Sequence, residues 1–374
     1  VAWKSNIGAA PSGLTVAEGK VHVAAVDAHT VHALNADNGK TAWTYTTDAR
    51  VDSPPTIHKG LAIFGSTDGR VYCLRDADGA EAWRFDAARS PRRVMSFGQL
   101  ESPWPVSGAV LIHEGKCWLS AGRSSYVDDG IILYALDPAT GKVARRNTIY
   151  SSDPKTGKMT PKTSQNKIPG LLNDILHTDG SNVFIRQMNV SAPDARSGPR
   201  LYTTGGYLDS SWFNRTFWKF GKAQSSGLMV RGKDVVFGLE LYSNRGRETV
   251  FKSASKAYSL VCYSLKAPVR PAVTRKTKGN RRQKGTPALW RQRLDIRTTA
   301  LLRAGDTLFA AGRPDVLDPR ISSEGVLAVF AAADGRKLAE YKLPAPPVWD
   351  GLAAAGGKLY VALTNGDIIA FKQQ

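Results

Sequence analysis

The sequence VHALNADNGKTAW at residues 31–43 decides the fold. It alternates branched and small side chains, passes through a turn at Gly39, and ends in a second alternating run that reaches Trp43. This pattern predicts two antiparallel strands joined by a tight turn, with glycine where the backbone needs a positive φ. The pattern returns 40 residues later as VYCLRDADGAEAW at residues 71–83, and that period is typical of one blade of a β-propeller.

Two further copies keep the strand and the turn but lose the tryptophan. LYALDPATGK at residues 133–142 is followed by Arg145, and LAVFAAADGR at residues 327–336 is followed by Ala339, where Trp43 stands in the first copy. Short glycine-bearing turns precede the expected inner strands, and their number predicts seven blades. The glycines of these turns are Gly19, Gly60, Gly115, Gly180, Gly232, Gly305 and Gly357.

The two ends of the chain predict how the ring closes. Residues 367–371 have the pattern of a third strand that no fourth strand follows, and residues 1–4 supply the missing strand. We therefore expect an all-β fold, a single seven-bladed β-propeller of four-stranded antiparallel blades over residues 1–374. The ring is closed by the N-terminal strand, which completes the last blade and removes an open sheet edge. Polar residues 149–169 and basic residues 264–289 are predicted loop insertions, each between a third and a fourth strand.

Charge and composition exclude several classes of function. The formal net charge is +19, and ten Lys and Arg but no Asp or Glu lie between Ser264 and Arg293. The basic loop from Lys266 to Lys284 lacks interleaved aromatic residues, and three prolines occur up to Pro287, so we expect a solvated loop and no nucleic-acid partner. No apolar run approaches the roughly 18 residues of a membrane-spanning helix, so no membrane span is expected. The chain begins with Val1 and no leader pattern, which predicts a piece of a larger polypeptide.

The predicted site is one mouth of the central channel. In a propeller, the loops between blades and the loops between second and third strands open on one face, where function gathers. Small polar residues recur at one aligned position near the axis. Two Ala-Gly-Arg copies, at residues 121–123 and 311–313, predict loops between second and third strands that carry arginines at the rim. A structural role, in which small residues relieve crowding and Arg–Asp pairs hold blades together, explains these positions equally well. The predicted ligand-binding residues are Asp52, Ser53, Gln99, Glu101, Trp104, Arg123, Asp174, Asp209, Trp212, Arg297, Arg313 and Asp350.

Residues 31–43 resemble the repeat found in pyrroloquinoline-quinone (PQQ) dehydrogenases and in a non-catalytic outer-membrane assembly lipoprotein. Residues 50–56, 97–102, 206–212 and 350–353 resemble a propeller family of planctomycete-type bacteria labelled PQQ-binding-like. The resemblance implies a periplasmic or secreted protein. True quinoprotein dehydrogenases have eight blades, a pair of adjacent cysteines over the quinone, and Glu, Asn and Asp around calcium. The three cysteines here are far apart and are expected in the core.

Three functions follow as hypotheses. The leading one is a ligand-binding or protein-scaffolding module of a larger exported bacterial protein, with a polar small molecule, a glycan or a protein as partner. The second is an oxidoreductase that depends on PQQ and Ca²⁺, with Asp52, Glu101, Asp174 and Asp350 as base or metal ligands and Trp104 against the quinone. The third is binding of sulfated or uronic glycans by Arg123, Arg313 and the basic loop. The sequence assigns no catalytic residue, no metal ligand and no definite cofactor.

Overall fold

The structure is a computed structural model that describes residues 1–96, 98–152, 155–158, 173–186, 188–191, 201–203, 218–220, 223–225, 227–240, 258–266, 288–314 and 323–372. These residues form 32 β-strands and one short 3-10 helix, and every strand pairing is antiparallel. The predicted all-β fold is confirmed. The chain divides into two compact units, which are described one at a time.

Unit 1 comprises Val1–Arg196, Gly205–Asn214 and Pro347–Gln374. Three of its sheets have four consecutive strands: β2 (Thr15–Ala17), β3 (Lys20–Ala25), β4 (Thr30–Asn35) and β5 (Thr41–Thr46); β6 (Thr56–His58), β7 (Leu61–Gly65), β8 (Arg70–Arg75) and β9 (Glu81–Asp86); and β12 (Leu111–His113), β13 (Lys116–Ala121), β14 (Ile131–Leu136) and β15 (Val143–Ile149). A three-stranded sheet contains β16 (Leu176–Thr178), β17 (Val183–Ile185) and β18 (Met188–Asn189). A further sheet joins β30 (Pro347–Ala355), β31 (Lys358–Leu363) and β32 (Asp367–Lys372) to β1 (Trp3–Asn6). The helix η1 (Val26–Ala28) connects β3 to β4, and β10 (Val94–Ser96) and β11 (Gln99–Glu101) form a separate hairpin.

Unit 2 comprises Ser197–Thr204 and Arg215–Pro346. Its described strands are β19 (Leu201–Thr203), β20 (Trp218–Phe220) and β21 (Ala223–Ser225) in one sheet; β22 (Met229–Arg231), β23 (Val235–Glu240), β24 (Ser259–Ser264) and β25 (Trp290–Arg293) in the next; and β26 (Ile296–Ala304), β27 (Thr307–Pro314), β28 (Gly325–Ala331) and β29 (Lys337–Leu343) in the last.

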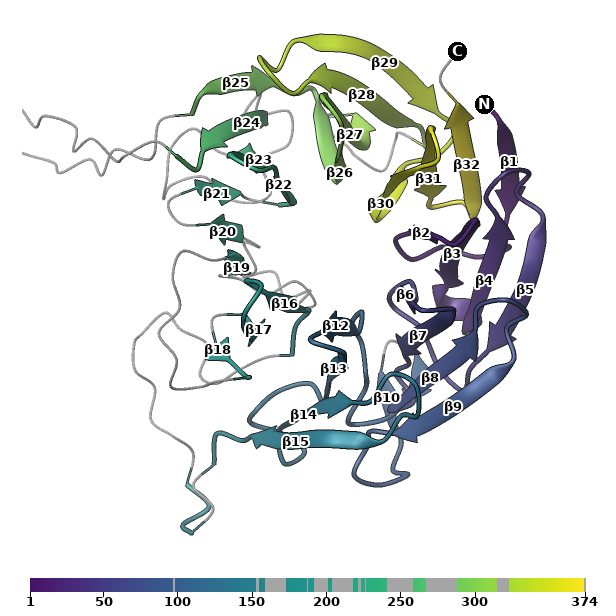
Figure 1. The fold of residues 1–374 in the computed structure, drawn as a ribbon, viewed down its shortest axis with the longest axis vertical. Coiled ribbons are helices and arrows are strands. Elements are labelled where there is room, and N and C mark those ends of the chain that lie inside the picture. The colour runs from purple at the N-terminus through teal and green to yellow at the C-terminus, as the bar shows by residue number, and fades with distance from the viewer. Residues whose placement is uncertain are drawn as a thin grey trace, which may run out of the picture. The chain divides into compact units, whose positions relative to one another are not determined.

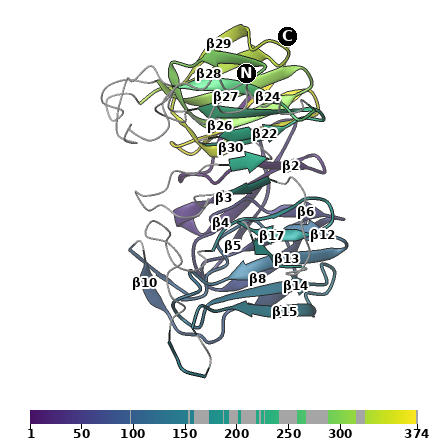
Figure 2. The ribbon, with the colours of Figure 1, turned by 90° about the vertical axis from the view of Figure 1, so that its left-hand side faces the viewer.

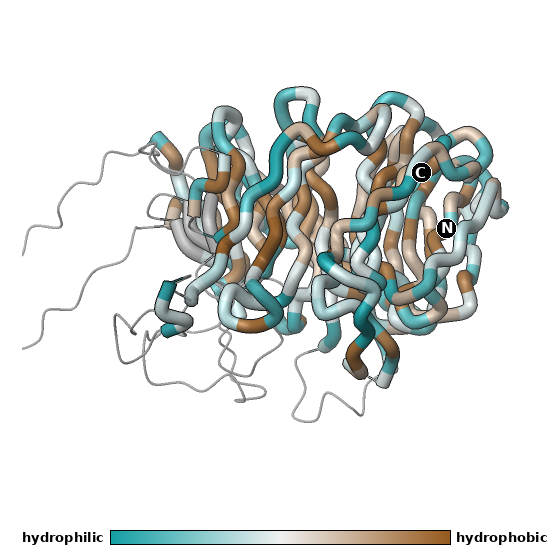
Figure 3. Tube along the Cα trace, turned by 90° about the horizontal axis from the view of Figure 1, so that it is seen from below, coloured by the Kyte–Doolittle hydropathy of each residue, from teal (hydrophilic) through white to brown (hydrophobic). Residues whose placement is uncertain are grey.

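Neighbouring sheets of unit 1 stand side by side through their first strands (Figure 1). The strand β2 lies next to β30 and β6, and β12 lies next to β6 and β16. Strands in the middle of a sheet are covered on both faces by the adjacent sheets, so all six residues of β14 are buried. The fourth strand β9 is largely exposed, and apolar residues concentrate along the strands while polar residues gather at the turns (Figure 3).

The seven predicted glycine turns each connect the first and second strands of a different sheet. Each turn therefore follows the first strand of its sheet and precedes the second. The predicted polar stretch is also misplaced, because residues 150–175 follow the fourth strand β15 and lead to the first strand of the next sheet. The basic stretch, residues 265–289, connects the third strand β24 to the fourth strand β25, and residues 267–287 lie outside the described part of the chain.

The N-terminal strand lies where the sequence places it. The strand β1 pairs with β32, with Trp3 opposite Ala370 and Asn6 opposite Asp367. The first residues thus supply the fourth strand of the sheet that the last residues begin. Between Leu176 and Ser225 the described strands belong to two three-stranded sheets, β16–β18 in unit 1 and β19–β21 in unit 2. Across the described residues, no helix has the length and apolar character that crossing a membrane requires.

Tryptophans of the fourth strands connect one sheet to the next by packing and hydrogen bonding. In each case the indole N–H donates to a backbone carbonyl of the following sheet at 2.8 to 3.2 Å, and the ring covers the glycine of that sheet's turn. These tryptophans therefore pack between neighbouring sheets. The sets are Trp3 with Ala36 and Gly39, Trp43 with Asp76 and Gly79, Trp83 with Pro138 and Gly141, and Trp290 with Ala332 and Gly335.

Replacement of Gly79 by alanine is expected to lower the free energy of unfolding by about 2 to 4 kcal/mol. Gly79 has φ 75°, and a Cβ there would lie 2.8 Å from the Trp43 ring. Gly60 is a matched control, because its φ is 74° but nothing lies within 4 Å of its added Cβ. Gly60→Ala isolates the backbone cost, about 1 to 2 kcal/mol. Equal losses for both variants in urea denaturation would contradict the steric role of Trp43.

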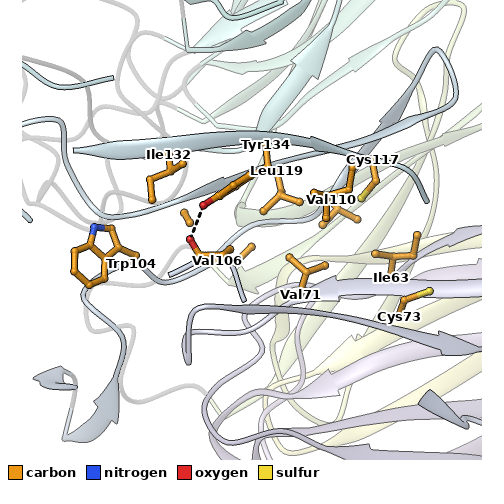
Figure 4. Packing of buried hydrophobic residues seen from close by; sticks show 13 residues of the cluster. Ile63, Val71, Cys73, Trp104, Val106, Val110, Cys117, Leu119, Ile132 and Tyr134 are labelled. Carbon is orange, nitrogen blue, oxygen red and sulfur yellow. Dashed lines mark hydrogen bonds between the residues drawn. The ribbon is translucent and has the colours of Figure 1, made fainter. Parts of the chain in front are cut away.

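The core between the sheets β6–β9 and β12–β15 contains two cysteines. Cys73 on β8 and Cys117 on β13 are buried in one apolar cluster with Ile63 and Leu119, and the two sheets contribute facing side chains (Figure 4). Burial raises the pKa of both thiols to about 12, which keeps them in the unreactive protonated form. Cys262 is buried in unit 2, so all three cysteines are core residues, as predicted.

Candidate functional site

Three connecting segments of unit 1 come together on one face and form the candidate site, which we call the mouth surface. They are residues 47–55 between β5 and β6, residues 87–110 between β9 and β12, and residues 122–130 between β13 and β14. The second segment contains the β10–β11 hairpin, which stands apart from the four-stranded sheets in the side view (Figure 2). The mouth surface thus combines connections between sheets with a loop between second and third strands.

Glu101 is the centre of the mouth surface. Its side chain is almost fully buried, and its two carboxylate oxygens bind arginines from the other two segments. Arg50 donates from Nε and Nη2 to Oε1 at 2.9 and 2.7 Å, and Arg123 donates from Nη2 to Oε2 at 2.6 Å. Charge-assisted bonds of this length are stronger than neutral ones, so Glu101 joins three segments that are distant along the chain.

Gln99 and Asp52 extend this network toward η1. The Gln99 Oε1 lies 2.8 Å from His29 Nε2, and Gln99 Nε2 donates to Asp27 at 3.4 Å. Burial raises the pKa of Asp52, and Arg50, whose Nη1 lies 3.9 Å from the Asp52 carboxylate, opposes that rise. Ser53 beside Asp52 is partly exposed.

Trp104 is a structural residue in this surface. Its ring is 5% exposed, its Nε1 donates to the Asp128 carbonyl at 2.6 Å, and the Arg92 guanidinium lies 5.4 Å from the ring centroid. Arg92 also pairs with the Asp128 carboxylate. The predicted stacking of Trp104 on a quinone does not fit this environment, because protein already covers the ring.

Asp174 and its neighbour Asn173 join the next sheet to the mouth surface. Asp174 is 2% exposed, and its Oδ2 lies 3.3 Å from Arg186 Nε. Asn173 donates from Nδ2 to Gly122 O at 2.7 Å and accepts a bond from Ser120 Oγ at 2.6 Å. These contacts are internal, so the described partners of both residues support a structural role.

The small serines near the axis satisfy backbone groups within their own unit. In unit 1, Ser12 Oγ accepts the Ala24 N–H at 3.0 Å and donates to Gly13 O. In unit 2, Ser225 Oγ accepts the Leu239 N–H at 2.8 Å and donates to Leu228 O. The structural explanation of these two ring positions is supported.

The remaining predicted residues separate into two groups. Arg297 and Arg313 both belong to unit 2, where they are direct partners on the adjacent strands β26 and β27. The prediction that Arg313 lies in a loop is wrong, because β27 continues through Pro314. Asp209 and Trp212 lie outside the described residues.

Asp350 has an unusual backbone and an unusual pKa. It lies in β30 with φ 54°, and desolvation by the surrounding protein raises its pKa to about 6 even though the residue is exposed to solvent. The raised pKa means that the folded protein favours the neutral acid. The contribution of Asp350 to stability is therefore complete below about pH 4 and is lost as the pH rises through about 6.

Asp350→Asn is expected to unfold at higher urea concentration than the original protein at pH 7, with a difference that shrinks as the pH falls from 6 to 4. Asparagine tolerates the positive φ, so the backbone is retained. Asp350→Ala removes the same charge but adds a backbone cost, and its difference from Asp350→Asn measures that cost. A stability difference between Asp350→Asn and the original protein that is constant from pH 4 to 7 would contradict the desolvation of Asp350.

Several residues in or beside the mouth surface were missed by sequence reasoning. Arg50, His29, Ser96 and Arg186 each bind a predicted residue, yet none was a candidate. One signal was available for the hairpin, because residues 87–110 are a far longer connection than residues 47–55. A long connection between blades is a place where an extra element is expected.

The donors present do not fit a calcium-bound quinone. Glu101 is held by two arginines and Asp174 by one, so neither carboxylate has its charge available for a cation. Within the described ranges, no group of three or more His, Cys, Asp or Glu is arranged to hold a metal ion. Cys73 and Cys117 are not adjacent in sequence and lie in an apolar core. The rim arginine Arg123 is likewise already paired with a carboxylate.

Comparison with known proteins gives a family match and likenesses of fold. A family described as outer membrane protein assembly factor BamB matches residues 1–230. The BamB of Xanthomonas campestris pv. campestris is 30% identical over 110 residues, which cover 25% of this chain and 26% of that protein. The match thus spans about a quarter of that curated relative.

Two solved structures share the fold at low identity. The quinohemoprotein alcohol dehydrogenase from Comamonas testosteroni superposes with TM-score 0.56 and 13% identity, covering 99% of this chain and 76% of that one. The quinohemoprotein alcohol dehydrogenase ADHIIG from Pseudomonas putida HK5 gives TM-score 0.53 and 15% identity, covering 96% of this chain and 71% of that one. Identities this low support a common fold and carry no information on activity.

Proposed function

Because this chain belongs to the family described as outer membrane protein assembly factor BamB, we propose that it is a non-enzymatic scaffold that holds a protein partner at its mouth surface. In this proposal the two units form one closed propeller of seven blades over residues 1–374. Seven turns that each join the first two strands of a separate sheet, and the pairing of β1 with β32, support that architecture. We place the protein in the envelope of a bacterium, as an exported module among the PQQ-binding-like propellers of planctomycete-type bacteria.

The observation that carries the proposal is the state of Glu101. An enzyme or a cation site needs polar groups that are available to a substrate, whereas Glu101, Arg50 and Arg123 bind one another. Such an internal network fixes the shape of a surface, and a fixed surface lowers the entropy cost of binding a protein. A polar small molecule or a glycan is the less favoured ligand, because Arg123 would have to leave Glu101 to bind it.

Photo-crosslinking in the native bacterium tests the scaffold. A photoreactive phenylalanine analogue is placed at Val127 and Ser53 on the mouth surface, and at Val143 and Tyr341 on outer strands as exposed controls. The expected result is one discrete protein adduct from the mouth positions and none from the controls. Absence of any adduct from both mouth positions would overturn the proposal.

Addition of PQQ with Ca²⁺ separates the scaffold from the oxidoreductase alternative. The quinone absorbance is expected to stay unchanged, and no dye reduction with primary alcohols is expected. A shifted quinone spectrum together with turnover that is lost in Asp52→Asn would establish the enzyme instead.

A further inference from the structure

The β10–β11 hairpin has its polar face inward and its apolar face outward. Ser96 and Gln99 are opposite one another and face the rest of unit 1. Ser96 binds Arg123, and Gln99 binds His29. Met95 and Leu100, also opposite one another, point the other way and are 69% and 59% exposed. Alternate residues of a strand face opposite sides, so this hairpin reverses the usual arrangement of a surface sheet. Large apolar side chains held together at a surface mark a site of interaction.

The inner face of the hairpin is anchored to three different segments. Glu101 binds Arg50 and Arg123, and Gln99 binds His29 next to η1. Arg93 adds a bond to the Asp68 carbonyl at 2.8 Å. A two-stranded hairpin is marginally stable by itself, so these contacts are what hold Met95 and Leu100 in a fixed, exposed position.

The backbone of the hairpin has open edges. The strands β10 and β11 pair with each other, and in the described part of the chain neither pairs with a third strand. An open edge next to alternating side-chain positions is the arrangement to which an extended peptide adds as another strand.

The charge beside the apolar pair is positive. Residues 87–100 contain Arg89, Arg92 and Arg93 and no Asp or Glu. Arg92 pairs with Asp128, whereas Arg89 and Arg93 donate to neutral oxygens. Among the described residues, Arg89 and Arg93 form no ion pair with a carboxylate, so two guanidinium charges in the segment that leads into the hairpin suit an acidic partner segment.

We propose that the β10–β11 hairpin is the docking strand of the mouth surface, and that its occupant is an extended, acidic segment of a partner protein. That segment pairs with the hairpin edge, places alternate apolar side chains against Met95 and Leu100, and directs carboxylates toward Arg89 and Arg93. The proposal rests on the proposed scaffold function and names the chemistry of its partner.

Peptide binding to the intact chain tests the docking strand. The probe is a fluorescein-labelled peptide of alternating leucine and glutamate, and fluorescence anisotropy gives its Kd. The double variant Met95→Ser with Leu100→Ser is expected to weaken binding at least about tenfold. The matched control is Val143→Ser with Leu338→Ser, which removes two apolar residues of 48% and 46% exposure on outer strands and is expected to leave Kd unchanged.

Two altered peptides test the mode of binding. A peptide methylated on alternate backbone nitrogens is expected to lose binding, because strand addition needs those N–H groups. A leucine and lysine peptide is expected to bind at least about tenfold more weakly, since it meets like charge. Equal binding of the methylated peptide, or an unchanged Kd in the hairpin variant, would overturn the proposal.

Other occupants give different results. Hairpin-dependent dimers in sedimentation velocity would assign the surface to a second copy, and hairpin-dependent flotation with phosphatidylglycerol vesicles would assign it to a lipid surface; either result overturns the proposal. The crosslinking experiment at the mouth surface distinguishes failure of the docking-strand proposal from failure of the scaffold proposal. Crosslinks that persist in the hairpin variant overturn the docking strand alone, whereas their absence from the original protein overturns the scaffold.

Discussion

Glu101→Ala is expected to lower the free energy of unfolding by about 3 kcal/mol, because it leaves Arg50 and Arg123 facing each other without their shared carboxylate. The value lies at the low end for a broken buried pair because the Arg123 side chain is 30% exposed and water can screen it. Urea denaturation followed by tryptophan fluorescence measures the loss.

Formate provides the control for Glu101→Ala. The deleted side chain leaves a space lined by two guanidinium groups, which a small carboxylate fits. Formate is expected to raise the unfolding midpoint of Glu101→Ala and to leave that of the original protein unchanged, with chloride at equal ionic strength as the reference. A loss below about 1 kcal/mol would show that the hairpin is held mainly by its other contacts.

Trp43→Ala is expected to cost about 4 kcal/mol of unfolding free energy. The substitution removes the ring that covers Gly79 and leaves the buried Asp76 carbonyl without the indole N–H, 2.8 Å away. Thermal unfolding and urea denaturation both measure it. The contacts that are lost lie between the sheets β2–β5 and β6–β9, which the Trp43 ring joins.

Trp43→Phe divides this effect into its parts. Phenylalanine keeps most of the ring contact but cannot donate a hydrogen bond, so a loss of about 1 to 2 kcal/mol is expected. Tyr341→Ala, at a position that is 53% exposed, is expected to change stability by less than about 0.5 kcal/mol. Equal losses for Trp43→Ala and Trp43→Phe would mean that the hydrogen bond, and not the packing, joins the sheets.

The repeat in the sequence predicts much of the fold because each copy encodes local physics. The glycine of each turn, the alternating strands and the tryptophan at Trp43 and Trp83 are all visible in residues 31–83. Where the tryptophan is absent, the sequence does not predict which residue connects one sheet to the next. At one such position Arg145 donates a hydrogen bond to Ser191 O at 2.6 Å. The likeness of residues 311–313 to residues 121–123 predicts a loop, but β27 continues through Pro314, and Arg313 pairs with Arg297 on β26.

The sequence named some residues of the candidate site but did not predict their contacts. Gln99, Glu101 and Arg123 were named from their place near the mouth, and the structure brings all three together on one face. Their pairing with one another could not be predicted, because it depends on a hairpin whose position is fixed by Arg50 and His29 from other segments. Long-range contacts of this kind depend on the folded arrangement and leave no period in the sequence.

The rate at which the buried thiols are modified reports how often the packed sheets of this protein separate. At neutral pH a thiol reagent meets almost no thiolate at Cys73 or Cys117 while the cluster between their sheets stays closed. Reaction then waits for the two sheets to separate, so the rate of modification in the native state measures how often that seam opens. The modification rate of Cys262 reports opening of unit 2 in the same experiment. A bound partner that bridges the sheets of unit 1 would slow the modification of Cys73 and Cys117 and leave that of Cys262 unchanged.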